Sequence, residues 1–156
     1  KENKNKKIIK KKKKKDKKNK CEIINTNDWM VEKSFEGKGE NKNLDKTEDD
    51  EIILDIGLNT VSSINQIIDQ SNTVLWNGPA GYFENKNFAV GTKSIAENIS
   101  KNTLERSLIS VVGGGDTLSA INQSKIKLSF SHLSTAGGAF LEYLEGKDLP
   151  GLSVLK

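Results

Sequence analysis

The chain has 156 residues, of which 34% are apolar, and a formal net charge of +4, values that describe one small, mildly basic domain. No segment approaches the roughly 18 consecutive apolar residues of a membrane span, and no apolar signal segment follows the lysine-rich start, so we expect a soluble, cytoplasmic protein. A single cysteine, Cys21, and a single histidine, His132, exclude a disulfide framework and a zinc-ligand set.

The positive charge lies in the first twenty residues. Residues 1–20 carry a local charge of +11, whereas residues 21–50 carry −5 and residues 51–156 carry −2. Six consecutive lysines, Lys10 to Lys15, repel one another, so we interpret residues 1–20 as a disordered lysine-rich tail. Binding to nucleic acid, to an anionic membrane or to a nuclear-import receptor stays open as an alternative. Because the tail has no aromatic residue to stack on bases, we expect no specific nucleic-acid partner.

Residues 21–50 show no sustained period of either a helix or a strand. Trp29, Met30 and Val31 form a short apolar island, and the segment ends in an acidic run from Glu48 to Glu51. We therefore predict mostly irregular chain over residues 21–50.

From residue 51 onward, short apolar runs alternate with helical periodicity. The runs predict buried strands at residues 52–54, 73–76, 108–112 and 130–133. The periodicity predicts helices that begin at Asn59 or Thr60, span residues 92–99, begin at a capping Asp116, and span residues 139–144. Strand followed by helix four times over is typical of a parallel sheet. The predicted fold class is therefore α/β, an incomplete Rossmann-like parallel sheet with flanking helices, preceded by the disordered tail.

Three glycine-containing loops follow the predicted strands, at residues 76–84, 113–117 and 134–139. In open parallel sheets, ligands bind at the carboxyl ends of the strands, where loops lead into helix N-termini. Gly113, Gly114 and Gly115 allow close backbone approach, and the helix that follows offers free N–H groups, a combination that predicts an anion site. The glycine spacing fits neither a Walker loop nor a Rossmann fingerprint.

Asp116 stands where the anion would bind and would repel a phosphate unless a cation lay between them. Asp116 is therefore a candidate partner of Mg²⁺, with a plain helix N-cap as the alternative. Gly137 and Gly138 form a second candidate anion cradle. Glu84 is a candidate acceptor for ribose hydroxyls, with a solvated loop acid as the alternative. Trp76 is expected in the core, and a partly buried histidine is favoured over a catalytic base for His132.

The three loops, in this order, resemble the C-terminal domain of phosphoglycerate kinase. The matching text is EIILDIG, then VLWNGPAGYFE followed by FAVGT, then VVGGGDT, then FSHLSTAGGAFLEYLEGKDLPGL. The resemblance covers residues 51–156 as a partial nucleotide-binding domain. Residues 21–50 are a degraded counterpart of a family segment, and residues 1–20 have no counterpart.

The resemblance implies glycolytic transfer of a phosphoryl group between 1,3-bisphosphoglycerate with ADP and 3-phosphoglycerate with ATP, using Mg²⁺. It implies that Asp116 is the metal partner and that Gly137 and Gly138 stabilise charge on the transferring group. The remaining implied nucleotide-binding residues, besides Asp116, are Asn77, Glu84, Gly114, Gly115 and Thr117.

The sequence also departs from the family pattern. Ala136 and Phe140 replace a glycine and a serine of many members, and Leu58 stands where the family usually has proline. The phosphoglycerate-binding N-terminal domain and the start of the C-terminal domain have no match in this sequence. We therefore expect 3-phosphoglycerate to bind only if that domain is supplied, a monomer as is usual in the family, and an exposed sheet edge with an uncovered apolar face.

Three hypotheses follow. The chain is a phosphoglycerate kinase represented by part of its nucleotide half, an inactive fragment with weak nucleotide binding, or a polybasic interaction protein. Because positioning of both reactants is the main catalytic contribution, we expect little kinase activity from the chain alone.

Overall fold

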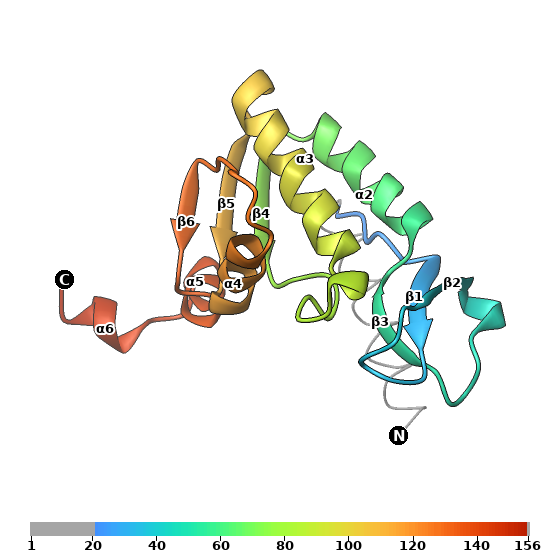
Figure 1. Cartoon of the computed structure of the whole chain (residues 1–156). Helices are drawn as coiled ribbons and strands as arrows, with labels where there is room; N and C mark the ends of the chain where they lie inside the picture. The colour runs from blue at the N-terminus through green and yellow to red at the C-terminus, as the bar shows by residue number, and fades with distance from the viewer. Residues whose placement is uncertain (1–20, 156) are drawn as a thin grey trace.

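The computed structural model describes residues 21–155, and the predicted tail over residues 1–20 lies outside them (Figure 1). Within the described residues, six strands and five helices follow one another with two short 3-10 turns, Leu44–Lys46 and Lys86–Phe88. The strands are β1 (Asp28–Glu32), β2 (Glu40–Asn43), β3 (Ile52–Ile56), β4 (Thr73–Asn77), β5 (Ile109–Gly113) and β6 (His132–Ser134). The helices are α2 (Leu58–Gln70), α3 (Val90–Arg106), α4 (Gly115–Gln123), α5 (Gly138–Leu144) and α6 (Pro150–Ser153).

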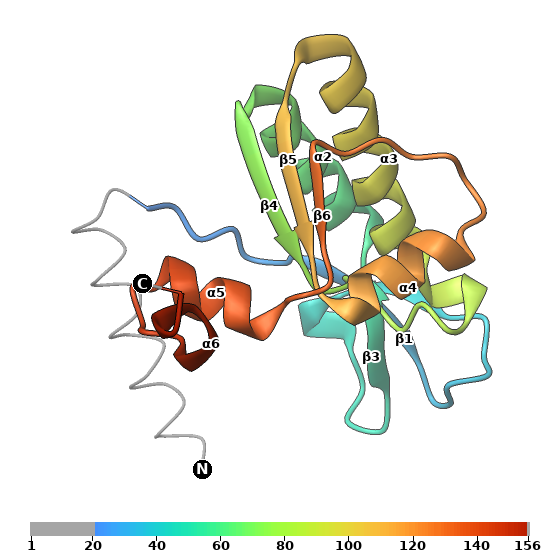
Figure 2. The same cartoon turned by 90° about the vertical axis from the view of Figure 1, so that its left-hand side faces the viewer.

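The predicted parallel sheet is present, with strand order β4-β5-β6. Figure 2 shows these strands in front, with α2 and α3 stacked behind them. Trp76 of β4 pairs with Val112 of β5, and both side chains are buried against Ile95 and Ile99 of α3. The α/β fold class is thus confirmed, and the expected core position of Trp76 is confirmed by its 8% exposure.

A second, antiparallel sheet with strand order β2-β1-β3 corrects two predictions. The prediction of irregular chain over residues 21–50 was wrong for β1 and β2. The run at residues 52–54 does form a strand, but it pairs antiparallel with β1 instead of joining the parallel sheet. β2 has the sequence ENKN and contains no apolar residue, so only its pairing with β1 makes it a strand. A strand that forms through its pairing alone leaves no hydrophobic period in the sequence.

The N-terminus of α2 is capped from a distance. The helix begins at Leu58, with Gly57 as its N-cap. The prediction that it starts at Asn59 or Thr60 was therefore wrong. Instead, the buried carboxylate of Asp28 in β1 accepts hydrogen bonds from the backbone N–H groups of Asn59 and Thr60, at 2.9 and 2.8 Å. Burial opposes ionisation of Asp28, but these bonds and one from the Thr60 hydroxyl outweigh it and lower the pKa of that carboxyl.

A second buried carboxylate, Asp55 of β3, lies at the start of α3. Its Oδ2 accepts a hydrogen bond from Gly91 N at 2.8 Å, in the first turn of the helix. This helix spans Val90–Arg106 and is longer than the predicted residues 92–99; it ends at Ser107, whose φ of 56° is left-handed. Both long helices therefore receive their N-terminal carboxylates from the antiparallel sheet, which fixes that sheet against the helical layer.

The parallel sheet has one open face. Trp76 and Val112 point toward α3, so the alternating residues Leu75 and Ile109 point away from it, and they are 43% and 56% exposed. This agrees with the expected uncovered apolar face. At the sheet's edge, the strand predicted at residues 130–133 is β6, which begins two residues later and ends one residue later. His132 is exposed, not partly buried. Within residues 21–155, no helix is long and apolar enough to cross a membrane.

Asp55 makes the stability of the fold depend on pH. Burial raises the pKa of its carboxyl from the ordinary 3.8 to about 6, although backbone hydrogen bonds from Gly91 and Ile56 oppose this. Between about pH 4 and pH 6 the folded chain therefore binds more protons than the unfolded chain, and the free energy of unfolding falls as pH rises through that window.

We predict that Asp55→Asn removes this dependence while it keeps an oxygen acceptor for Gly91. Urea unfolding of both proteins from about pH 4 to pH 7 should show the wild type losing stability relative to the variant as pH rises. A constant offset between the two proteins is irrelevant to the test. A difference in unfolding free energy that does not change with pH contradicts the assignment.

Candidate functional site

The three glycine-containing loops meet at the carboxyl edge of the parallel sheet. A Cβ added at Gly114 would lie 2.9 Å from Asn77 Oδ1, and one added at Gly137 would lie 3.0 Å from the Cα of Gly114. Gly114 N also donates to Ser134 O at 3.1 Å. The structure therefore brings Asn77, Gly114 and Gly137 together, with backbone packed on backbone.

Gly114 begins α4 as its N-cap, with a φ of 95°. The alternative in which Asp116 caps this helix was therefore wrong. Asp116 lies instead in the first turn, where its side chain is exposed. The first-turn N–H groups of a helix have no intrahelical partner, and nothing lies within 4 Å of a Cβ placed at Gly115. Gly115 and Asp116 are exposed, so the start of α4 presents backbone donors and a positive dipole end to solvent.

The residues around Asp116 fit a magnesium ion that is bound to the phosphates of a ligand. They do not form a complete metal site by themselves. Among residues 21–155, no group of three or more His, Cys, Asp or Glu side chains is placed to hold a metal. Mg²⁺ is typically held by one or two carboxylates together with substrate phosphates and water. Asp116 is a single exposed carboxylate beside the unpaired amides of α4, which suits that arrangement.

Thr117 joins two of the loops. Its side chain is fully buried, and its hydroxyl accepts a hydrogen bond from Gly78 N at 2.7 Å. The indole N–H of Trp76 donates to Gly78 O at 2.7 Å, so Gly78 is held through both its N–H and its carbonyl group. The sequence predicted a ligand contact for Thr117 and gave no sign of this second task, because the two loops are 39 residues apart.

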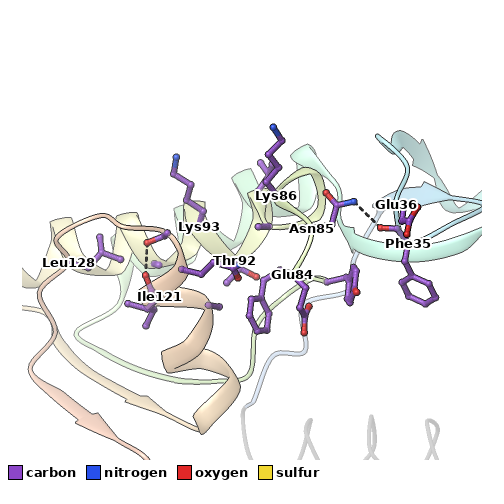
Figure 3. A pocket seen from close by; sticks show the side chains of 17 residues that line it. Phe35, Glu36, Glu84, Asn85, Lys86, Thr92, Lys93, Ile121 and Leu128 are labelled. Atoms are coloured by element: carbon purple, nitrogen blue, oxygen red, sulfur yellow. Dashed lines mark hydrogen bonds between the residues drawn. The ribbon is translucent and has the colours of Figure 1, made fainter.

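Glu84 lies in a turn at the edge of a cavity of about 880 Å³ (Figure 3). The turn is closed by a hydrogen bond from Asn85 N to Tyr82 O at 3.2 Å, which makes Phe83 and Glu84 its central residues. In Figure 3 the Glu84 carboxylate points away from the ammonium groups of Lys86 and Lys93. The Glu84 side chain is exposed, and within residues 21–155 it has no hydrogen-bond or ion-pair partner. Its carboxylate is therefore available to a ligand.

The antiparallel sheet contributes residues that the sequence reasoning missed. Phe35 lines the 880 Å³ cavity and also a smaller cavity of about 340 Å³ formed with Ile52–Ile56 and the Pro79–Tyr82 loop. Tyr82 lines both cavities, and its ring lies edge-on to that of Phe35 with centroids 5.1 Å apart. Because residues 21–50 were predicted to be irregular, no sequence signal placed Phe35 beside the Glu84 turn.

Comparison with known proteins gives one family throughout. The family model described as phosphoglycerate kinase matches residues 1–147, a span that extends further toward the N-terminus than the quoted motifs. A phosphoglycerate kinase of Xanthobacter autotrophicus is 46% identical over 138 residues, covering 87% of this chain and 35% of the relative. One of Francisella philomiragia is 50% identical over 115 residues, covering 74% of this chain and 28% of the relative.

Solved structures agree. The phosphoglycerate kinase of Coxiella burnetii has a TM-score of 0.80 and 36% identity, over 92% of this chain and 36% of that one. The enzyme of Pyrococcus horikoshii has a TM-score of 0.72 and 30% identity, over 85% of this chain and 32% of that one. The chain thus spans about a third of the length of the relatives it matches.

The close packing at Gly114 predicts the effect of adding a methyl group there. Gly114→Ala places a Cβ at a positive φ and against Asn77 Oδ1, so we expect a loss of about 1–3 kcal/mol of stability. Gly115→Ala is the matched control, because a Cβ there meets nothing within 4 Å and alanine favours helix. Thermal unfolding of both variants is the measurement. Equal unfolding temperatures for the two variants would show that the loops do not pack as described.

Proposed function

The chain belongs to the phosphoglycerate kinase family, and on that premise we propose that it carries part of the family's nucleotide half, a binding site for ADP or ATP with Mg²⁺. The transfer of a phosphoryl group between 1,3-bisphosphoglycerate and ADP, a glycolytic and cytoplasmic reaction, is proposed for the complete enzyme. Residues 1–156 correspond to about a third of it.

The observation that carries this proposal is the packing of Asn77, Gly114 and Gly137 at the sheet edge. The first turn of α4 is exposed at Gly115 and Asp116, and backbone amides at the start of a helix, together with the helix dipole, bind phosphate oxygens. In the proposed complex, the backbone N–H groups of Gly115 and Asp116 bind the nucleotide phosphates, and Gly114, whose own N–H is bonded to Ser134 O, sets the turn that places them there. Asn77 lines the cleft, and Thr117 holds the Gly78 peptide beside it.

Asp116 and Glu84 have separate tasks in the proposed site. Mg²⁺ neutralises phosphate charge when bound, and the exposed Asp116 carboxylate is the protein group that holds it, directly or through water. Glu84, whose carboxylate is free of partners within the described residues, accepts hydrogen bonds from the ribose hydroxyls.

Gly137 and Gly138 are proposed to stabilise charge on the transferring phosphoryl group. Gly138 begins α5, and a Cβ there meets nothing within 4 Å, so its backbone is accessible. Phosphoryl transfer relies on positioning and charge stabilisation, and both reactants must be held for it. We therefore expect little turnover from residues 1–156 by themselves. The second candidate is a nucleotide-binding chain without kinase activity, while the polybasic hypothesis concerns residues 1–20, outside the described residues.

Isothermal titration with ADP, with and without Mg²⁺, tests the site. Asp116→Asn should weaken Mg-ADP binding by about tenfold, because a charged contact to the metal is lost. The same change should leave binding of metal-free ADP unchanged or strengthen it, because the carboxylate otherwise repels the phosphates. Asp45→Asn, at an exposed carboxylate in the first 3-10 turn, is the control. Equal Mg-ADP affinities for wild type and Asp116→Asn would remove Asp116 from the metal role.

A further inference from the structure

The turn that presents Glu84 is gripped at both of its ends by the loop between β1 and β2. We define this loop, Lys33–Gly39, as the hairpin loop. The turn runs from Tyr82 to Asn85 and is exposed at its centre, where Glu84 has no partner within residues 21–155. Exposed turns of this kind are normally mobile, so what holds its ends decides where the carboxylate points.

At one end, the side chain of Asn85 bonds to the backbone of the hairpin loop. Its Nδ2 donates to Phe35 O at 2.8 Å (Figure 3) and also to Gly37 O at 3.2 Å. Its Oδ1 accepts a hydrogen bond from Asn87 N at 3.0 Å, which fixes the amide in its orientation. Asn87 Nδ2 donates to the same Gly37 carbonyl at 3.0 Å. Four side-chain hydrogen bonds therefore hold the C-terminal end of the turn.

At the Tyr82 end of the turn, one contact is between aromatic rings and the other is a backbone hydrogen bond. The Tyr82 ring packs edge-on against Phe35, and Tyr82 N donates to Leu54 O at 2.7 Å. The hairpin loop also closes against Phe88, which is fully buried. A Cβ at Gly39, where φ is 76°, would lie 2.6 Å from the Phe88 ring. The hairpin loop therefore packs both on Tyr82 of the turn and on the buried ring of Phe88 that follows it.

We propose that contacts between the hairpin loop and the turn position Glu84 for the nucleotide ribose. The two positioning residues are Phe35 of the hairpin loop and Asn85 of the turn. This inference rests on the proposed function and adds to it a specificity device. Because both ends of the turn are already held, binding of the ribose hydroxyls to Glu84 loses less conformational entropy than it would in a mobile turn. Neither residue touches the nucleotide in this account, since each acts through the turn.

The test compares ADP with 2′,3′-dideoxy-ADP, both with Mg²⁺, by calorimetric titration of the full chain. The ratio of the two affinities reports the ribose contact alone, because a loss of folded protein lowers both affinities equally. We expect wild type to prefer ADP, Asn85→Ala to lower that preference by about fivefold, and Phe35→Ala to lower it by about two- to threefold. Phe35 is 51% exposed, so its variant should fold even if Asn85→Ala does not.

Asn98→Ala is the matched control. Asn98 also donates from its side-chain amide, to Asn65 O and Asp69 Oδ1. It belongs to α3 and bonds to α2, so it makes no contact with the hairpin loop. It should leave the affinity ratio unchanged. A wild type that prefers ADP, with both Asn85→Ala and Phe35→Ala keeping the full preference, overturns the positioning role and leaves the proposed function intact. A wild type that does not bind Mg-ADP overturns the proposed function and this inference with it.

Discussion

The hydrogen bond from Gly91 N to the buried carboxylate of Asp55 joins the two halves of the structure. Asp55 belongs to the antiparallel sheet and Gly91 to the first turn of α3, which covers the parallel sheet. A Cβ at Gly81 would collide with the same carboxylate, so the loop between β4 and α3 is held where it passes β3. Together with the hydrogen bond from Tyr82 N to Leu54 O, this contact holds the loop that carries Glu84 against β3.

The candidate site follows from where strands and helices end. Parallel strands carry their carboxyl ends to one edge of the sheet, so Asn77 and Gly114 meet there although they are far apart in sequence. Gly114 has a φ that an L side chain rarely adopts, and this conformation turns β5 directly into α4. The chemistry of the site is therefore mainly backbone chemistry, with Asp116 as its one carboxylate at the phosphate end.

Sequence reasoning succeeded where the hydrophobic period is local. The three strands of the parallel sheet, and the helices that follow β4, β5 and β6, each carry their own pattern. The three loops were expected at the carboxyl ends of these strands, and Asn77, Gly114 and Gly137 do meet there. It failed where an element depends on contacts outside its own segment. Asp28 caps a helix about 30 residues away, and β2 becomes a strand only by pairing with β1. Phe35 reaches the Glu84 turn only because those contacts fold residues 28–56 into a sheet. The contact between Phe35 and that turn therefore could not be predicted from the sequence.

Amide chemical shifts during titration with Mg-ADP test most directly the central claim that nucleotide phosphates meet the backbone at the start of α4. The account predicts that the amide signals of Gly115 and Asp116 shift with added nucleotide. The amide of Gly146, which closes a turn after α5, should stay unchanged. Shifts that spare Gly115 and Asp116, or no shifts at saturating nucleotide, contradict the claim.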